Sequence, residues 1–189
     1  MNETVRTFVA VLLPDAVKQR IGVFLEDVIR MRADVKWVKP DNIHITLKFL
    51  GDVDNHKIGE VSACVQEAVR PFVRFTIGIA GTGMFPNDRR PSVLWIAVRE
   101  GAETLIQMAG CMDSALARVG FQKERRPFSP HLTIGRVRSS KRIEDTVTFM
   151  QKSEWNAGSF EADAVAVMKS DLRPAGALYT PLATIKLQG

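Results

Sequence analysis

The sequence predicts an α+β fold built on a largely antiparallel or mixed β-sheet. Strand-like and helix-like segments alternate along all 189 residues, and several connections are too short for the crossover that parallel strands need. Residues 44–47 and 131–134 also repeat one pattern, His–apolar–Thr–apolar, once in each half of the chain. We therefore expect one domain over residues 1–189, in which two halves related by a pseudo-twofold contribute matching strands to a shared cleft.

The first half of the chain contains strands rich in β-branched and aromatic residues and helices whose apolar residues recur every three or four positions. In chain order we expect a strand at 5–13, a helix at about 15–29, an extended piece around Trp37, a strand at 43–50 and a helix at about 57–69. Gly51 and the acidic stretch 52–55 end the strand before the second helix, and Pro71 stops that helix.

The second half continues the alternation. We expect strands at 72–80 and 93–98 with a Gly-rich loop at 81–83 between them, a helix at about 102–119, a strand at 130–137, a shorter helix at about 142–152, and strands near 160–168 and 177–187. No proline- or serine-rich linker separates these segments. Pro174 and Gly176 make the turn between the last two strands.

Composition narrows the class of protein. With 46% hydrophobic and 25% charged residues, the chain fits a compact soluble domain. No apolar stretch is long enough for a membrane helix, and the run from Phe8 to Leu13 is too short for a signal peptide. We therefore expect a cytoplasmic protein that makes no use of a membrane. Cys64 and Cys111 lie in helix-like segments and are expected to be reduced core thiols.

Positive charge is concentrated between Arg118 and Arg142, although the net charge is only +5. The cationic residues there are Arg118, Lys123, Arg125, Arg126, Arg136, Arg138, Lys141 and Arg142, opposed only by Glu124. Such a run is typical of a protein that binds a polyanion. It is equally compatible with a solvated face of a basic protein.

The repeated motif suits the chemistry of a phosphodiester. Residues i and i+2 of a strand project to the same side, so His44 lies beside Thr46, and His131 beside Thr133. Imidazoles titrate near neutral pH, so one ring can accept a proton from water while the other donates a proton to the leaving oxygen. The threonine hydroxyls can donate hydrogen bonds to the phosphate oxygens. This chemistry needs no metal ion.

The sequence gives no support for a metal site, a phosphate-binding glycine loop or a serine nucleophile. His56 follows acidic residues but has no motif, and a metal site with Asp52 or Asp54 has no ligand spacing behind it. The Gly81–Gly83 segment has neither a phosphate-binding lysine nor a following helix, and no Gly-x-Ser-x-Gly nucleophile motif occurs. We therefore expect neither a metal nor another cofactor.

The two motif segments resemble the signatures of a known family. Residues 37–51 (WVKPDNIHITLKFLG) and 128–136 (FSPHLTIGR) resemble those of the two-histidine phosphoesterases, and more narrowly the RNA 2′,3′-cyclic phosphodiesterases, also called the 2′-5′ RNA ligase family. Weaker echoes extend over nearly the whole chain, in 6–10, 85–95 and 169–179. The resemblance implies a bilobal α+β fold in which two small, mostly antiparallel sheets flank a central cleft, with helices on the outside.

The resemblance also implies roles. His44 would donate the proton to the departing 3′ oxygen, and His131 would activate the water, so that a 2′,3′-cyclic phosphate opens to a 2′-phosphomonoester. Some relatives run the reaction backwards and join RNA ends through a 2′-5′ linkage. We expect RNA ends or cyclic nucleotides as partners of a monomeric enzyme.

Substrate binding is expected to involve residues near the motifs. Arg136 would reach the phosphate only if its strand ends or bulges near Gly135, because it lies five residues after His131. Arg126, with its neighbour Arg125, would guide an RNA backbone. Trp37 and Phe49 would stack on a base, although core packing is the alternative for both.

Two competing hypotheses belong to other classes. The first is a nucleotide- or RNA-binding module that uses the same cleft without turnover, which would have no need of two titratable imidazoles. The second is a metal-dependent phosphodiesterase, whose activity a chelator would abolish. Turnover of a cyclic mononucleotide in the presence of chelator separates these two hypotheses from each other and from the metal-independent enzyme.

Overall fold

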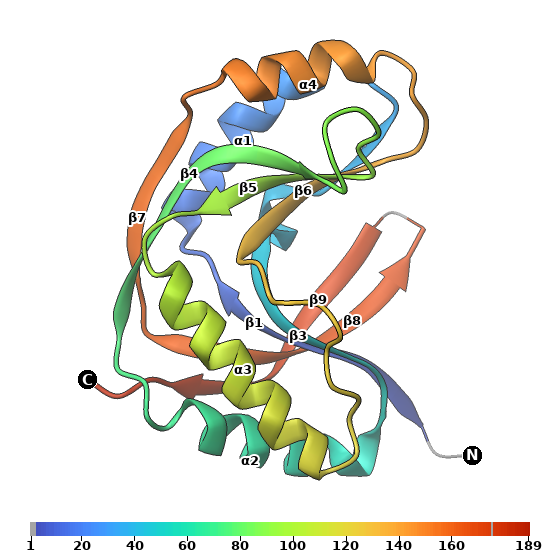
Figure 1. Cartoon of the computed structure of the whole chain (residues 1–189). Coiled ribbons are helices and arrows are strands. Elements are labelled where there is room, and N and C mark those ends of the chain that lie inside the picture. Colours follow the sequence, from blue (N-terminus) through green and yellow to red (C-terminus); the bar gives the residue numbers. More distant parts are fainter. Residues whose placement is uncertain (1–2, 175) are drawn as a thin grey trace.

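The computed structural model describes residues 3–174 and 176–189, which form one curled antiparallel sheet and four α-helices (Figure 1). The strands are β1 (Thr4–Leu12), β2 (Val35–Trp37), β3 (His44–Asp54), β4 (Phe75–Phe85), β5 (Val93–Val98), β6 (His131–Val137), β7 (Asn156–Ala162), β8 (Ala164–Arg173) and β9 (Gly176–Lys186). The helices are α1 (Asp15–Ile29), α2 (Ile58–Val69), α3 (Ala102–Arg118) and α4 (Ile143–Lys152), with short 3-10 turns η1 (Pro40–Asn42) and η2 (Asn55–Lys57). The predicted α+β fold is confirmed.

The sheet has two halves that meet at one seam. Its strand order is β7-β4-β5-β6-β3-β1-β8-β9, and β2 pairs with β6. The seam lies between β6 and β3, which are joined through a single register pair, Ile45 with Leu132. The two expected sheets are therefore continuous, and each half places its motif strand at the junction.

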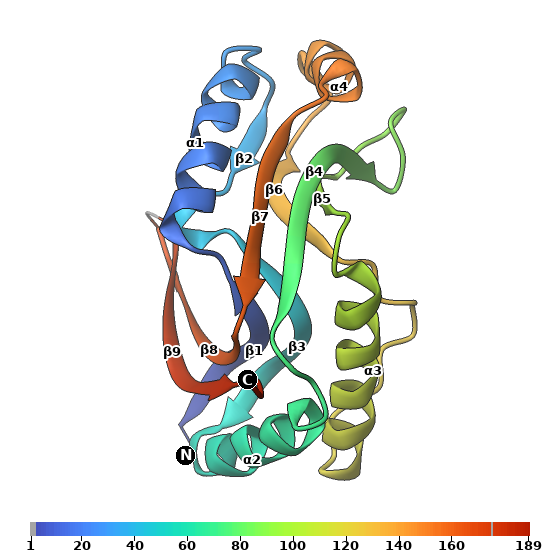
Figure 2. The same ribbon diagram turned by 90° about the vertical axis from the view of Figure 1, so that its left-hand side faces the viewer.

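All four helices pack against one face of the sheet. Buried residues from each helix, among them Ile21, Val65, Met108 and Met150, join a single main core. Figure 2 shows α1 and α4 at one end of the molecule and α2 at the other end. No helix of the described residues has the length and apolar character needed to cross a bilayer.

The motif strands bury their intervening apolar residues in this core. Ile45 and Leu132 are both 0% exposed, and Leu47 and Ile134 are buried beside them. The opposite side of the seam carries the motif histidines and threonines, and we call it the motif face. A second, smaller core of Phe8, Ala10, Ala166 and Met168 adjoins it. The burial that the sequence predicted for the motif strands is confirmed.

Three predicted segment boundaries are wrong. β3 continues past Gly51 to Asp54, because Gly51 adopts a left-handed φ of 74° and the acidic residues still pair with β1. The expected loop 81–83 is part of β4, where Gly83 leaves room for the ring of Trp95 on β5. The expected strand 160–168 is two strands separated at Asp163, because β7 pairs with β4 whereas β8 pairs with β1.

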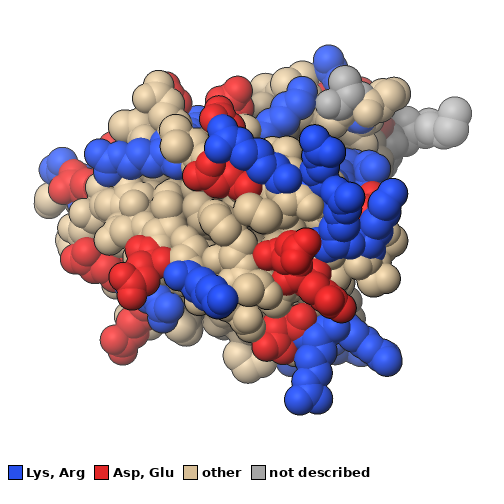
Figure 3. Space-filling model, turned by 90° about the horizontal axis from the view of Figure 1, so that it is seen from above, with Lys and Arg blue, Asp and Glu red and all other residues tan. Residues whose placement is uncertain are grey.

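Two other expectations also need correction. Both cysteines are free thiols, but Cys111 is exposed and Cys64 is only half-buried, so neither is a fully buried core residue. The basic run is not one patch, because Arg118 ends α3 near α2 while Lys141 and Arg142 precede α4 at the other end (Figure 1). On the face seen in Figure 3, Lys and Arg gather at one side and are interspersed with Asp and Glu elsewhere.

Candidate active site

The two motifs lie side by side across the seam. Ile45 is opposite Leu132 in an antiparallel pair. Because the two strands run in opposite directions, His44 lies across from Thr133, and Thr46 lies across from His131. Each imidazole therefore lies next to the threonine of the other motif. Sequence periodicity predicted that each histidine and threonine share a face, and the register brings the two pairs together.

Both imidazoles make the same hydrogen bond to the backbone. Nδ1 of His44 lies 2.8 Å from the carbonyl oxygen of Asn42, and Nδ1 of His131 lies 2.7 Å from the carbonyl oxygen of Ser129. A carbonyl oxygen only accepts, so each Nδ1 carries the hydrogen and donates it. Nε2 is then left for chemistry in both rings, as an acceptor when the ring is neutral and a donor when it is protonated.

His44 is held among aromatic side chains. Its ring stacks on Phe8 with centroids 4.7 Å apart, and it meets the edge of Tyr179 at 5.2 Å. This burial lowers the pKa of His44 below its ordinary value, while the hydrogen bond to Asn42 opposes that shift. Asn42 is itself fixed, because its Nδ2 donates to the carbonyl oxygen of Ala177 at 2.7 Å.

His131 has aromatic neighbours from β4 and β5. The ring of Phe85 meets it edge-on at 5.1 Å, and Trp95 lies 6.1 Å away between ring centroids. Trp95 is opposite Thr133 in the β5–β6 pair. Aromatic walls from both halves therefore orient the two imidazoles.

The threonine hydroxyls remain available for a ligand. Thr46 and Thr133 are half-buried, and neither side chain forms a hydrogen bond to another residue within 3–174 and 176–189. β-branched residues restrict χ1 in a strand, so the position of each hydroxyl is limited to few rotamers. Both can donate to an oxygen of a bound anion.

A β-bulge in each motif strand changes which residues share the motif face. The register shifts by one between Val9 and Ala10, opposite Lys48 and Thr46 of β3. It shifts again between Leu94 and Trp95, opposite Gly135 and Thr133 of β6. An extra residue reverses the alternation of side chains beyond it. As a result Phe49 and Arg136, each five residues after a motif histidine, come to the motif face.

The strand that carries Arg136 has the bulge near Gly135 that Arg136 needs to reach the motif face. A Cβ on Gly135 would lie 2.6 Å from Val35 on the core side, so the next residue points to the other side. The charge of Arg136 also acts on Tyr179, whose pKa is raised by burial and lowered in part by Arg136 and Arg6. Arg136 is therefore close enough to influence a ring that touches His44.

The other predicted substrate-binding residues are placed differently. Phe49 is 45% exposed, and the guanidinium of Arg6 lies over its ring at 4.7 Å. Trp37 pairs with Gly135 and packs against the main core. It therefore has the core-packing role that was the alternative to base stacking, and it does not reach the motif face. Arg126 lies on the loop before β6, beside a pocket next to the middle of β3.

Sequence reasoning missed several residues around the motifs. Phe8 and Tyr179 flank His44, Phe85 and Trp95 flank His131, and Arg6 covers Phe49. Period-two alternation within each strand would have put some of these residues on one face. Only the order of the strands shows that they adjoin a histidine.

No group of three His, Cys, Asp or Glu among the described residues is placed to hold a metal ion. His56 is exposed in η2, which follows β3 at the end opposite to the motif residues. That the reaction needs no metal stays a prediction.

The antiparallel sheet with two His-x-Thr strands at its central seam defines a two-histidine phosphoesterase. The chain belongs to the 2′-5′ RNA ligase superfamily, whose sequence model matches residues 14–174.

Similar proteins span nearly the same length. The chain is 34% identical to an RNA 2′,3′-cyclic phosphodiesterase of Methanothermobacter thermautotrophicus, over 97% of this chain and 99% of the relative. It is 36% identical to an RNA 2′,3′-cyclic phosphodiesterase of Aquifex aeolicus, over 82% of each chain.

Solved structures share the fold. Escherichia coli LigT in complex with 3′-AMP superposes with a TM-score of 0.80 at 26% identity, over 99% of this chain and 100% of LigT. A protein of Thermus thermophilus gives a TM-score of 0.81 at 25% identity, over 97% and 98% of the two chains.

Proposed function

We propose that this protein is an RNA 2′,3′-cyclic phosphodiesterase that opens the cyclic phosphate to a 2′-phosphomonoester by acid–base catalysis without a metal. The observation that carries the proposal is the pair of imidazoles at one seam, each with Nδ1 donating to a carbonyl oxygen and Nε2 left free. The names of the full-length relatives support the same activity.

The reaction needs one proton removed and one supplied. Nε2 of His131 takes a proton from water as the water oxygen forms a bond to phosphorus. The bond from phosphorus to the 3′ oxygen breaks, and Nε2–H of His44 gives that oxygen its proton. The product carries a 2′-phosphate and a 3′-hydroxyl, and a proton transfer through solvent restores the two rings.

The surroundings of His44 make its protonation depend on whether the substrate is bound. Burial lowers its pKa in the free protein, which by itself disfavours the protonated form that a donor needs. A phosphodiester anion beside the ring favours the cation and opposes this effect. His44 would therefore acquire its proton most readily when the phosphate is bound.

The remaining polar groups would stabilise the transition state and the RNA. Thr46 and Thr133 would donate to the non-bridging oxygens, and Arg136 would offset the charge that develops on them. Phe49 would present to a base the ring face that Arg6 leaves open. Arg126 would contact the RNA backbone.

A complete set of these groups lies within one chain. We therefore propose that the two halves act as a single domain and that the protein works as a monomer. Two free thiols fit a reducing compartment, which supports the expected cytoplasmic location.

Turnover of a 2′,3′-cyclic mononucleotide in the presence of chelator tests this function. The wild type should hydrolyse it, and His44→Ala and His131→Ala should each lower kcat by about 10²- to 10⁴-fold, the usual contribution of a general acid or base. His56→Ala is the matched control, because it removes an exposed histidine outside the motifs. Binding without turnover in the wild type would favour the binding module, and loss of activity with chelator would favour a metal enzyme.

A further inference from the structure

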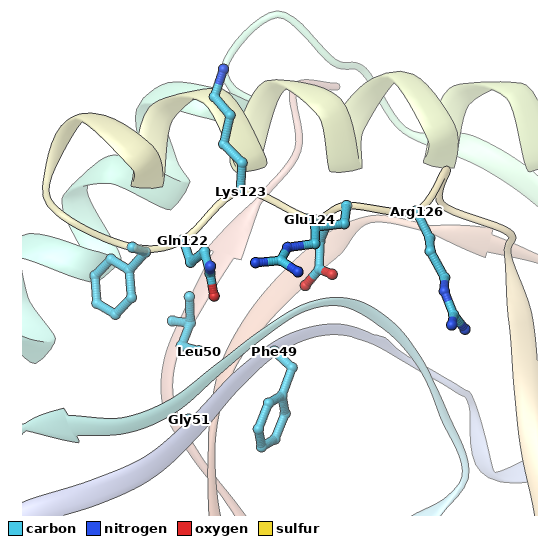
Figure 4. Close-up of a pocket in the computed structure, with 9 residues that line it drawn as sticks. Phe49, Leu50, Gly51, Gln122, Lys123, Glu124 and Arg126 are labelled. Atoms are coloured by element: carbon cyan, nitrogen blue, oxygen red, sulfur yellow. The ribbon is translucent and has the colours of Figure 1, made fainter.

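A pocket of about 430 Å³ lies beside the motif face, between the middle of β3 and the loop that joins α3 to β6. Its strand side is formed by residues 49–51 and its loop side by residues 121–126. Figure 4 shows Leu50 pointing toward Gln122, while Arg126 and Lys123 leave the loop in opposite directions. This volume falls in the range of pockets that bind small ligands.

The lining combines positive charge with apolar surface. Arg125 and Arg126 are exposed, and neither forms an ion pair with any carboxylate in the described part of the chain. Glu124 lies 3.9 Å from Nζ of Lys48, so its charge is partly offset. Leu50 and Phe121 supply apolar wall. Free guanidinium groups next to an apolar wall suit single-stranded nucleic acid, which offers phosphates and base faces together.

A buried lysine fixes the loop that carries these arginines. The side chain of Lys48 is 2% exposed, and its Nζ donates to Oδ1 of Asp113 at 2.5 Å and to the carbonyl oxygen of Gln122 at 2.7 Å. The same Asp113 oxygen accepts from the backbone N–H of Glu124 at 3.0 Å. The loop is thus anchored to β3 and α3 on both sides of Lys123, and the pocket is formed before a ligand arrives.

The bulge in β3 between Thr46 and Lys48 joins this pocket to the reaction site. It turns Lys48 toward the loop and Phe49 toward the motif face. Phe8, the register partner of Phe49, stacks on His44. Phe49 follows Thr46 by three residues, roughly 10 Å along a strand, so the pocket begins beyond the space of the reacting phosphate. A cyclic phosphate is the 3′ end of its RNA, and every further nucleotide therefore lies on its 5′ side.

We propose that this pocket binds the RNA strand on the 5′ side of the terminal nucleotide. Arg125 and Arg126 hold its phosphodiester groups, and the wall of Leu50 and Phe121 receives a base. The inference rests on the proposed function and makes it specific, because the substrate is then an oligonucleotide end in preference to a free cyclic mononucleotide.

The test is a ratio of two specificity constants. The value of kcat/KM is measured for a trinucleotide that ends in a 2′,3′-cyclic phosphate and is divided by kcat/KM for the cyclic mononucleotide. The ratio should exceed one in the wild type. Arg125→Glu should lower it about tenfold, the size expected for one charge-assisted hydrogen bond. The slope of log(kcat/KM) against log[salt] for the trinucleotide should become shallower by about 0.7, as for one lost phosphate contact on a single strand.

Arg70→Glu is the matched control, since it makes the same charge change on an exposed residue outside the pocket. It should leave the ratio unchanged. A wild-type ratio of one, or equal losses in Arg125→Glu and Arg70→Glu, would overturn the pocket assignment and leave the proposed function standing. Hydrolysis of neither substrate would overturn the proposed function and this inference with it.

Discussion

His44 and His131 share one hydrogen-bond arrangement but differ in their surroundings. Each Nδ1 donates to the carbonyl oxygen two residues earlier, so the backbone just before each motif strand fixes the tautomer of its histidine. His44 is stacked against Phe8, and its burial is sufficient to lower its pKa. The protonation of the donor should therefore depend on whether a phosphate is bound.

The first prediction concerns the pH dependence of the rate. A proton donor must be protonated, so activity falls as pH rises through its pKa. In the free protein the pKa of His44 lies below the ordinary 6.5, and kcat/KM, which reports the free enzyme, should begin to fall below that pH. The bound phosphate raises the pKa, so kcat should fall at higher pH. If kcat/KM and kcat began to fall at the same alkaline pH, this account would be contradicted. NMR titration of the His44 imidazole in the ligand-free protein checks it independently.

The second prediction concerns the threonine hydroxyls. Thr46→Val and Thr133→Val keep the β-branched shape and remove one hydrogen-bond donor each, so each should lower kcat by about 10²- to 10³-fold. KM for the cyclic mononucleotide should change little, because the hydroxyls act mainly on charge that develops in the transition state. Thr76→Val, at an exposed position of β4, is the control. A rise in KM with unchanged kcat would assign the hydroxyls to ground-state binding instead.

At the scale of elements, single-residue bulges in β3 and β6 arrange both the site and its surroundings. One bulge brings Phe49 to the motif face and buries Lys48 toward α3, and the other brings Arg136 to the motif face. Ideal alternation places Phe49 and Arg136 on the opposite side of their strands. From the sequence, a bulge near Gly135 could only be stated as the requirement for Arg136 to reach the phosphate. Whether a strand bulges depends on the strand with which it pairs.

The third prediction concerns the ion pair that anchors the loop after α3. Burial raises the pKa of Asp113, but the hydrogen bonds from Lys48 and from the N–H of Glu124 outweigh it and leave the pKa below its ordinary value. Asp113→Ala would leave the buried ammonium of Lys48 without this partner and should lower the free energy of unfolding by about 3 kcal/mol. Urea denaturation measures the change.

Asp27→Ala is the matched control for this prediction. Asp27 pairs with Arg30 on the exposed surface of α1, and such pairs contribute less than about 1 kcal/mol. Equal losses of stability in the two variants would show that Lys48 does not depend on Asp113.

At the scale of the whole molecule, the site exists because two halves of one sheet meet at a seam. The repeated motif in a chain with only three histidines was enough to predict the four residues that the register brings together at this seam. Strand alternation predicted their shared face and the burial of Ile45 and Leu132.

The rest of the site depends on relations between strands that the order of residues does not contain. Phe8 and Tyr179 adjoin His44 only because β1 pairs with β3 and the β8–β9 hairpin follows β1. Trp37, which is adjacent to the first motif in sequence, faces the core because β2 pairs with β6. Nearness in sequence was therefore a poor guide to the residues around the motifs, whereas the repeated His-x-Thr pattern was a good guide to the residues that meet at the seam.

The most direct test of the central claim is the identity of the product. A defined oligonucleotide with a 2′,3′-cyclic phosphate end is incubated with the protein and chelator, and the 2′- and 3′-phosphate ends are separated. With His44 protonating the 3′ oxygen and His131 activating water, the product should carry the 2′-phosphate, and His44→Ala and His131→Ala should each slow its formation by about 10²- to 10⁴-fold. A 3′-phosphate product, or a 2′-phosphate product that either variant forms at the wild-type rate, would contradict the account.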